Sequence, residues 1–298
     1  MPPLPLPPEA LMRRVGWDVH SRRPGDVYEE RGREQWRLIK SLLPEDWSFE
    51  GKRVLDFGCG AGRIVRHALS EDPAGEYWGC DIDARSIEWL RANLSPPLHP
   101  FQTDEWPPTQ EPDGQFHLIY AFSVFTHLLD NWSAWLVELH RLLAADGLAV
   151  ITVFGPGIGS HAEVPLEEDA TGMNVLSPGT EWDAGGPLIV HSEWWLHAHW
   201  GRAFEIVELR PGVPGGPPPL FGQSILVMRR RPGSVTTAEL ERFEPDEPRE
   251  LAAVLANLAS LRREVENQAE ALRIYRTSRS WRLTAPMRAV AAFARKHR

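Results

Sequence analysis

Three glycines at alternate positions, with an aspartate nearby, form the stretch of this sequence that most clearly indicates chemistry. Gly58, Gly60 and Gly62 follow a short apolar run, and Asp56 lies two residues before the first of them. Glycine loses more backbone entropy on folding than any other residue, so such a cluster needs a conformational reason. The usual reason is a tight turn from a strand into a helix, where the backbone approaches a ligand. Residues 54–64 therefore predict a ligand-binding loop.

The segments around this loop alternate between apolar runs and helical periodicity. The expected elements are a helix at 27–44, a strand at 52–59, a helix at 62–71, a strand at 75–83, a helix at 84–94, a strand at 116–125, a helix at 131–147 and a strand at 148–155. This alternation predicts βαβ units and a parallel sheet that positions the loop.

The pattern changes after residue 155. Residues 155–190 are rich in glycine, proline and acidic residues, and a loop of this length is usually functional, so we expect a lid or an acceptor-site insertion. A helix at 192–201 then leads to strands at 204–210 and 223–231. A Gly/Pro-rich stretch joins these two strands, which predicts an antiparallel pair that closes the sheet.

Charge is divided unevenly along the chain. The net charge is −9, yet residues 249–298 hold eleven lysines and arginines against four acidic residues, and no acidic residue follows Glu270. The acidic remainder argues against a non-specific nucleic-acid binder. The basic end of the chain indicates a separate role.

Cysteine content and hydropathy predict a cytoplasmic protein. Cys59 and Cys80 lie in segments that we expect to be buried, so we interpret them as reduced thiols. The Pro-rich start lacks the apolar stretch of a signal peptide. No apolar run approaches the roughly 20 residues that cross a bilayer. We expect a soluble protein, or one that is peripheral at the inner face of the membrane.

The spacing D-x-G-x-G-x-G, which differs from the G-x-G-x-x-G of dinucleotide folds, resembles motif I of class I S-adenosylmethionine-dependent methyltransferases. The resemblance spans about residues 50–230 and includes 78–83 and 122–155, which are typical of bacterial small-substrate methyltransferases. It implies a Rossmann-like α/β sheet with helices on both faces and S-adenosylmethionine as cofactor. The strand end after 116–121 lacks the Asp-Pro-Pro-Tyr type of motif, which argues against methylation of DNA bases.

The resemblance also implies which carboxylates contact the cofactor. A carboxylate at the end of the second strand accepts hydrogen bonds from both ribose hydroxyls. Asp81 holds that place, and Asp83 is a nearby competitor that we expect to cap the following helix. Asp104 matches the position that accepts from the adenine amino group, with Glu105 as the alternative. Asp56 is expected near the amino end of the cofactor.

The other implied cofactor contacts are less polar. The glycine loop, Cys59 included, lies against the methionine portion of the cofactor. Ile82 lies against adenine, and Phe122 and Ser123 end a strand beside the methyl group.

Histidines are the candidate bases. Methyl transfer is an in-line displacement that depends chiefly on positioning, but a hydroxyl acceptor also needs a base. His127 is the first candidate, and its alternative role is capping or packing. His161 and His191 flank the variable segment and are further candidates. We expect no metal site, because His197 and His199 point to different faces of their helix.

Residues 249–275 carry a heptad pattern. Seven of the eight seam positions are apolar, which predicts a short coiled coil and therefore a homo-oligomer; the alternative is a helix folded back on its own domain. Gln268 is expected to fix the register. The seam positions are Leu251, Val254, Leu258, Leu261, Val265, Gln268, Leu272 and Tyr275.

Residues 278–290 resemble the SxSWRxTxPLR tail of bacterial enzymes that assemble surface polysaccharides. The matching residues are Ser278, Ser280, Trp281, Arg282, Thr284, Pro286 and Arg288, and Met287 departs from the pattern. Apolar residues among eight lysines and arginines after residue 270 suit an anionic membrane surface. The resemblance implies O-methylation of a glycan hydroxyl. The alternatives are a small metabolite or lipid as acceptor, or a non-catalytic coiled-coil scaffold that binds the cofactor.

These observations divide the chain into five expected parts. They are an N-terminal cap and helix at 1–48, the methyltransferase domain at 49–231, a linker at 232–248, a coiled-coil helix at 249–275 and a basic amphipathic tail at 276–298.

Overall fold

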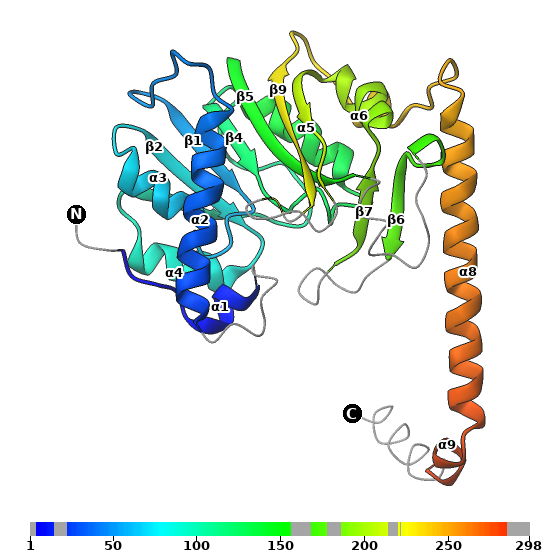
Figure 1. Ribbon diagram of the computed structural model, residues 1–298. Coiled ribbons are helices and arrows are strands. Elements are labelled where there is room, and N and C mark those ends of the chain that lie inside the picture. Colours follow the sequence, from blue (N-terminus) through cyan, green and yellow to red (C-terminus); the bar gives the residue numbers. More distant parts are fainter. Residues whose placement is uncertain are drawn as a thin grey trace. The chain divides into compact units, whose positions relative to one another are not determined.

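The structure is a computed structural model with two compact units, Met1–Ala253 and Val254–Arg298 (Figure 1). The described residues are 4–14, 23–155, 168–177, 186–213, 220 and 222–284.

Within the described ranges of the first unit, nine strands form one mixed sheet. The order along it is β3-β2-β1-β4-β5-β7-β6, and β9 pairs with both β5 and β8. Strands β1 to β5 are parallel, whereas β9 is antiparallel to β5 and β8, as expected for the closing pair. The strands are β1 (Arg53–Phe57), β2 (Glu76–Asp81), β3 (Leu98–Gln102), β4 (Phe116–Ala121), β5 (Leu143–Phe154), β6 (Met173–Ser177), β7 (Leu188–His191), β8 (Phe204–Arg210) and β9 (Gln223–Arg230).

Helices cover both faces of this sheet (Figure 1). Side chains of α2, α3 and α4 pack on one face, and those of α5 and α6 pack on the other. The helical segments of this unit are α1 (Glu9–Arg14), α2 (Pro24–Ser41), α3 (Val65–Glu71), α4 (Ala84–Asn93), α5 (Trp132–Leu142), α6 (Glu193–His199), α7 (Thr237–Glu241) and the short 3-10 turns at Glu168–Ala170 and Trp200–Arg202.

Strand β4 shows why a strand that is covered on both faces is mainly apolar. Leu118 and Tyr120 belong to the core under α2, whereas Ile119 and Ala121 belong to the core under α5. Successive side chains of a strand point to opposite faces, so a strand covered on both sides needs an unbroken apolar run. The expected Rossmann-like α/β fold with helices on both faces is confirmed.

Two expected boundaries differ from the structure. The helix expected at 131–147 ends at Leu142, because Leu143 pairs with Phe116 and already belongs to β5. The segment 155–190 contains strands β6 and β7, which pair antiparallel with each other, and β7 continues the sheet beside Phe154. Short strands among glycines and prolines give little periodicity, which is why the sequence pattern missed them.

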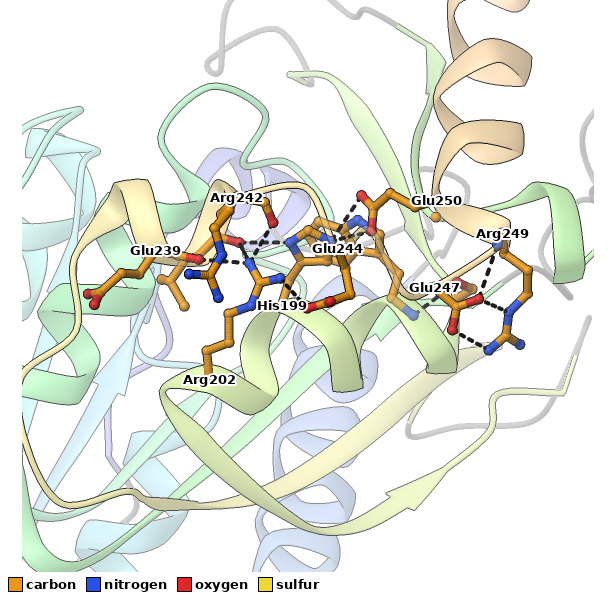
Figure 2. A network of polar contacts seen from close by, with 12 residues as sticks. His199, Arg202, Glu239, Arg242, Glu244, Glu247, Arg249 and Glu250 are labelled. Carbon is orange, nitrogen blue, oxygen red and sulfur yellow. Dashed lines mark hydrogen bonds and ion pairs between the residues drawn. The ribbon is translucent and has the colours of Figure 1, made fainter.

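The segment 232–248, expected as a linker, is packed on the domain. Helix α7 lies within it and begins with a capping box between Thr236 and Glu239, and Leu240 is fully buried. Figure 2 shows how Arg202 fastens this segment: its Nη1 donates to three backbone carbonyl oxygens, and its Nη2 donates to Glu244 at 3.0 Å. The start of the following helix is therefore anchored rather than loosely tethered.

A buried histidine–glutamate pair completes this anchor (Figure 2). Nδ1 of His199 donates to the carbonyl oxygen of Leu240 at 2.7 Å, and Nε2 lies 3.1 Å from the Glu250 carboxylate. His199 also stacks on Trp195 with ring centroids 4.3 Å apart. Both partners are buried, so removing either would leave the other uncompensated in the core.

The second unit, as far as it is described, consists of most of α8 (Arg249–Thr277) and the short α9 (Arg279–Leu283). The Ser278 hydroxyl accepts a hydrogen bond from the backbone N–H of Trp281 at 3.2 Å and so caps α9. The Trp281 ring returns to Tyr275 with centroids 4.6 Å apart. No helix in the described part of the chain is long and apolar enough to span a bilayer.

Candidate active site

The glycine loop joins β1 to α3 in the conformation that its glycines predicted. Gly58, Gly60 and Gly62 have φ of 77°, 51° and 81°, in the left-handed region that favours glycine. The backbone N–H groups of Gly58 and Cys59 both lie 2.9 Å from the carbonyl oxygen of Cys80. The loop is therefore held at the carboxyl end of β2, where ligands bind in open α/β sheets.

Gly58 is also required by packing. A Cβ at this position would lie 2.3 Å from Cγ2 of Val124, which is in the segment after β4. Backbone and side chain thus meet at the carboxyl ends of β1 and β4, where only a residue without a side chain fits.

Asp81 and Asp83, which the sequence left as competitors, have different partners. Oδ2 of Asp81 accepts from Gly60 N at 2.7 Å, and Oδ1 accepts from Asp83 N at 2.9 Å. Asp83 is almost fully buried and caps α4 through Ser86, as predicted. A carboxylate has about four acceptor positions, so Asp81 keeps capacity for a ligand's hydroxyls whereas Asp83 is occupied.

Asp56 lies in a different electrostatic environment from these two. Burial raises its pKa to about 7, although Tyr120 and Arg63 act in the opposite direction. The Tyr120 hydroxyl and the backbone N–H of Val65 are the protein donors that face this carboxyl. A cationic group of a ligand placed beside Asp56 would stabilise its ionised form, which burial disfavours.

Cys59 and Cys80 are free and buried, and burial raises the pKa of both thiols. Sγ of Cys59 points back to the carbonyl oxygen of Gly60 at 3.3 Å and contacts the region of Gly79. Cys59 therefore contributes its backbone and its packing to the loop.

The expected adenine side is more open. Ile82 is half-buried, and its carbonyl oxygen accepts from the Gln102 side chain at 3.3 Å. Asp104 and Glu105 are both exposed after β3. The Glu105 carbonyl accepts from Asn131 and from the Trp135 indole, which ties this loop to α5 and leaves Asp104 at the surface.

Ser123 is the strained residue of the site. It has φ of 59°, the positive value that residues with side chains adopt rarely and most often at functional sites. Its N–H donates to Thr152 Oγ1 at 2.8 Å, and its Oγ accepts from the Gln223 amide at 2.7 Å. Phe122 beside it is buried. Sequence reasoning found Ser123 and Phe122 but missed Thr152 and Gln223, which lie on other strands.

Helix α2 and the residue that follows Gly62 add side chains that sequence reasoning also missed. Tyr28, Arg31 and Arg63 line a small cavity of about 20 Å³. Burial raises the pKa of Tyr28 and lowers that of Arg63. The Arg63 cation in turn lowers the pKa of Asp56, and the Asp56 carboxylate contributes to the raised pKa of Tyr28. Cationic and hydroxyl groups of this kind suit a carboxylate. The only sequence signal was that Arg63 directly follows the glycines.

His127 and His191 differ sharply in environment. Nδ1 of His127 donates to the Pro187 carbonyl oxygen at 2.8 Å, the ring keeps an exposed surface, and partial burial lowers its pKa despite that bond. His191 is buried against Trp195 and Trp200, and burial lowers its pKa to about 3. The expectation that His191 faces an acceptor is not met, because an aromatic cluster encloses its ring. His161 lies outside the described residues.

No group of three or more His, Cys, Asp or Glu that could hold a metal ion occurs in the ranges that the structure describes. In particular, His199 is engaged by Leu240 and Glu250, and the exposed His197 lies near Glu193 on the same helix.

Comparison with known proteins assigns the chain to a family. A family model described as a methyltransferase domain matches residues 28–201. The chain therefore belongs to this family, and it is a class I S-adenosylmethionine-dependent methyltransferase. The match begins at α2 and includes the glycine loop, Asp81 and the strand end at Ser123.

Individual relatives are more distant. A malonyl-[acyl-carrier protein] O-methyltransferase of Halalkalibacterium halodurans is 27% identical over 162 residues, which are 49% of this chain and 59% of that protein. A crystal structure of a Pyrococcus horikoshii protein aligns with a TM-score of 0.51 at 14% identity, over 73% of this chain and 97% of that one, and shows the shared fold. A Burkholderia thailandensis 1,6-didemethyltoxoflavin-N1-methyltransferase with bound S-adenosylhomocysteine aligns with a TM-score of 0.49 at 18% identity, over 76% of this chain and 92% of that one.

The residues present fit the cofactor of this family. The glycine loop provides the close backbone approach, Asp81 keeps acceptor capacity, and Asp56 places a buried carboxyl at the start of the loop. A hydroxylated ribose and an ammonium group would satisfy the two carboxylates.

Proposed function

We propose that this methyltransferase methylates a glycan hydroxyl during the assembly of a bacterial surface polysaccharide. The observation that carries the acceptor class is the segment 278–290, whose sequence resembles the tail of enzymes that act in such assembly. Two residues of that resemblance shape the turn after α8: Ser278 caps α9, and Trp281 packs on Tyr275. The motif therefore has a local structural reason in addition to its resemblance.

The catalytic task is mainly one of positioning. The bound cofactor supplies an electrophilic methyl group on a sulfonium, the reactive part of the chemistry. Asp81 holds the ribose of the ligand, and the glycine loop lies against its methionine portion. Ser123, held by Thr152 and Gln223, lies just after β4, where the acceptor oxygen must be aligned. Such alignment converts an encounter into a near-unimolecular step.

His127 is the proposed base for the acceptor hydroxyl. Because Nδ1 carries the proton donated to Pro187, the neutral ring presents its lone pair at Nε2. The lowered pKa keeps the ring neutral near pH 7. Nε2 can then take the hydroxyl proton as the acceptor oxygen is methylated.

The basic tail is proposed to bring the enzyme to the membrane on which lipid-linked glycans are built. Eight lysines and arginines follow residue 270 without an acidic residue. Leu283 is largely exposed at the end of α9. Apolar groups next to basic ones favour an anionic membrane surface, with about 1 kcal/mol for each basic residue near it.

The second candidate acceptor is a small metabolite or a lipid, for example one that carries an acyl chain. It is favoured by the likeness to the malonyl-[acyl-carrier protein] O-methyltransferase. The matched stretch is 59% of that protein's length, so the likeness leaves room for another acceptor site. A third possibility, a scaffold that binds the cofactor without turnover, makes no methylated product.

One experiment separates these candidates. The purified protein is incubated with S-adenosylmethionine carrying a labelled methyl group, together with either a bacterial lipid-linked glycan extract or malonyl-acyl carrier protein. We expect label in the glycan fraction as an ether that survives mild alkali. Label only on the carrier protein, as an alkali-labile ester, would support the acyl acceptor. Cofactor binding without label in either fraction would support the scaffold.

A further inference from the structure

Helix α8 carries an apolar stripe that stays exposed in the described structure. Val254, Leu258, Val265, Leu272 and Tyr275 keep between 41% and 65% of their surface exposed. These residues share one side of the helix, because they are separated by steps of three and four or their sums. A contiguous apolar surface of this kind marks an interaction site.

We propose that this stripe pairs with the same stripe of a second copy of the chain, as a parallel and in-register coiled coil. The spacing places the stripe at the a and d positions of a heptad, the pattern that packs helices knobs-into-holes. The a positions from 258 onward are Leu258, Val265 and Leu272, and the d positions from 254 onward are Val254, Leu261, Gln268 and Tyr275.

Gln268 selects the parallel orientation. In a parallel in-register pair, each Gln268 faces the other, and their amides can donate to and accept from one another. In the antiparallel alignment that uses every layer, Gln268 would face Leu258 of the other copy. Its amide would then face an apolar side chain and keep only the bond from Nε2 to Glu264 of its own helix, at 2.8 Å, so the amide oxygen would be buried without a donor.

The flanking charges select the same orientation. In the antiparallel alignment, Arg262 would lie next to Arg262 of the other copy, and Glu264 would lie next to Glu264. Both are like-charge contacts, which are unfavourable. In the parallel alignment, Arg262 faces Asn257 and Glu264 faces Ala269, so no like charges meet. The sequence therefore both favours one pairing and penalises the other.

A parallel pair has a consequence for the basic tails. Because both copies of α8 run in the same direction, both tails leave the coiled coil at the same end. Two weakly binding tails at one end bind a surface more tightly than either alone, since the second contact is intramolecular. The dimer itself does not depend on which acceptor the enzyme methylates.

The experiment uses the full-length chain. Light scattering should give the mass of a dimer, Val265→Asp should give a monomer, and Asn267→Asp, which adds the same charge outside the stripe, should leave the dimer intact. Cofactor binding by each variant confirms that the catalytic domain is folded. A monomeric wild-type protein that binds cofactor, or a dimer unaffected by Val265→Asp, would overturn the proposal.

Disulfide cross-linking then tests the orientation. Under mild oxidation, Leu272→Cys should link two copies, whereas the outward-facing Glu270→Cys should not. The wild type is a blank, because Cys59 and Cys80 are buried. If Leu272→Cys links only when mixed with Val254→Cys chains, the pair is antiparallel and the proposed orientation is wrong. Equal linkage of Leu272→Cys and Glu270→Cys would contradict a specific seam.

Discussion

Asp56 and Asp81 end neighbouring strands, yet their surroundings give them different properties. Asp81 accepts two backbone hydrogen bonds, whereas Asp56 is buried beside the Tyr120 hydroxyl and near Arg63. Burial raises the pKa of both, and that of Asp56 reaches about 7. Asp81 is thus suited to accept hydrogen bonds from neutral hydroxyls, whereas Asp56 changes its charge near pH 7.

The Asp56 carboxyl leads to a prediction about proton release. If the cofactor's ammonium group lies beside Asp56, binding favours the ionised carboxylate and lowers its pKa from about 7. Near pH 6, binding of S-adenosylmethionine should then release about one proton, and affinity should rise with pH until it levels off above 7. Calorimetry in buffers of different ionisation enthalpy measures this release.

Asp56→Asn is the corresponding control, because the amide cannot titrate. It should abolish the buffer dependence of the binding enthalpy. Equal proton release by the wild type and Asp56→Asn would assign the proton to another group.

His127 gives a prediction about turnover. His127→Ala should lower kcat by about 10²–10⁴-fold with little change in cofactor affinity, since a general base acts only in the chemical step. In the wild type, kcat should fall as pH drops through the pKa of His127, which lies below the ordinary value of about 6.5. His197→Ala, an exposed histidine of α6, is the matched control. Unchanged kcat in His127→Ala would leave positioning as the whole of catalysis.

Among the elements, the glycine loop was the part most accessible from sequence. Its glycines needed positive φ, and the apolar runs before and after it needed strands covered on both faces. Asp83 as the cap of α4 was predictable for the same local reason. These inferences depend on residues close together in sequence, where backbone preference and side-chain chemistry act directly.

The contacts that sequence could not give join distant segments. Gln223 reaches Ser123 across 100 positions, and β7 joins β5 where Val190 pairs with Phe154. The positive φ of Ser123 has no sequence signal, and its partners Thr152 on β5 and Gln223 on β9 are distant in sequence. Long-range packing decides such features.

The loop's packing can be tested with two glycines of similar conformation. Gly58→Ala and Gly51→Ala both place a side chain at positive φ, which costs about 1–2 kcal/mol. Only Gly58→Ala also creates a contact of 2.3 Å, with Val124, whereas nothing lies within 4 Å of a Cβ at Gly51. Gly58→Ala should therefore lower the free energy of unfolding clearly more than Gly51→Ala, as measured by denaturant titration. Equal losses would mean that Val124 moves aside freely.

At the scale of the whole molecule, a folded catalytic unit leads into a long helix and a basic end. The His199–Glu250 pair anchors the start of α8, and Arg202 fastens the segment that precedes this helix. The segment expected to be a linker is therefore part of the domain. The residues after Ala253 form a compact unit of their own, in keeping with a role separate from catalysis.

The tail can be tested by removing residues 278–298. The full-length protein should bind anionic vesicles at low salt and dissociate from them as the salt concentration rises, because the attraction is electrostatic. The chain that ends at Thr277 should not bind vesicles in a flotation assay. It should still bind S-adenosylmethionine, as measured by calorimetry. A full-length protein that ignores anionic vesicles at low salt would point instead to docking on a partner enzyme.

The most direct test of the site at the carboxyl ends of β1, β2 and β4 is a crystal structure of the protein with S-adenosylhomocysteine. We predict both ribose hydroxyls on the Asp81 carboxylate, the amino group on Oδ2 of Asp56, and the sulfur facing Ser123 with His127 on the acceptor side. A ligand held by Asp83 in place of Asp81, or a sulfur directed away from the carboxyl end of β4, would contradict this assignment.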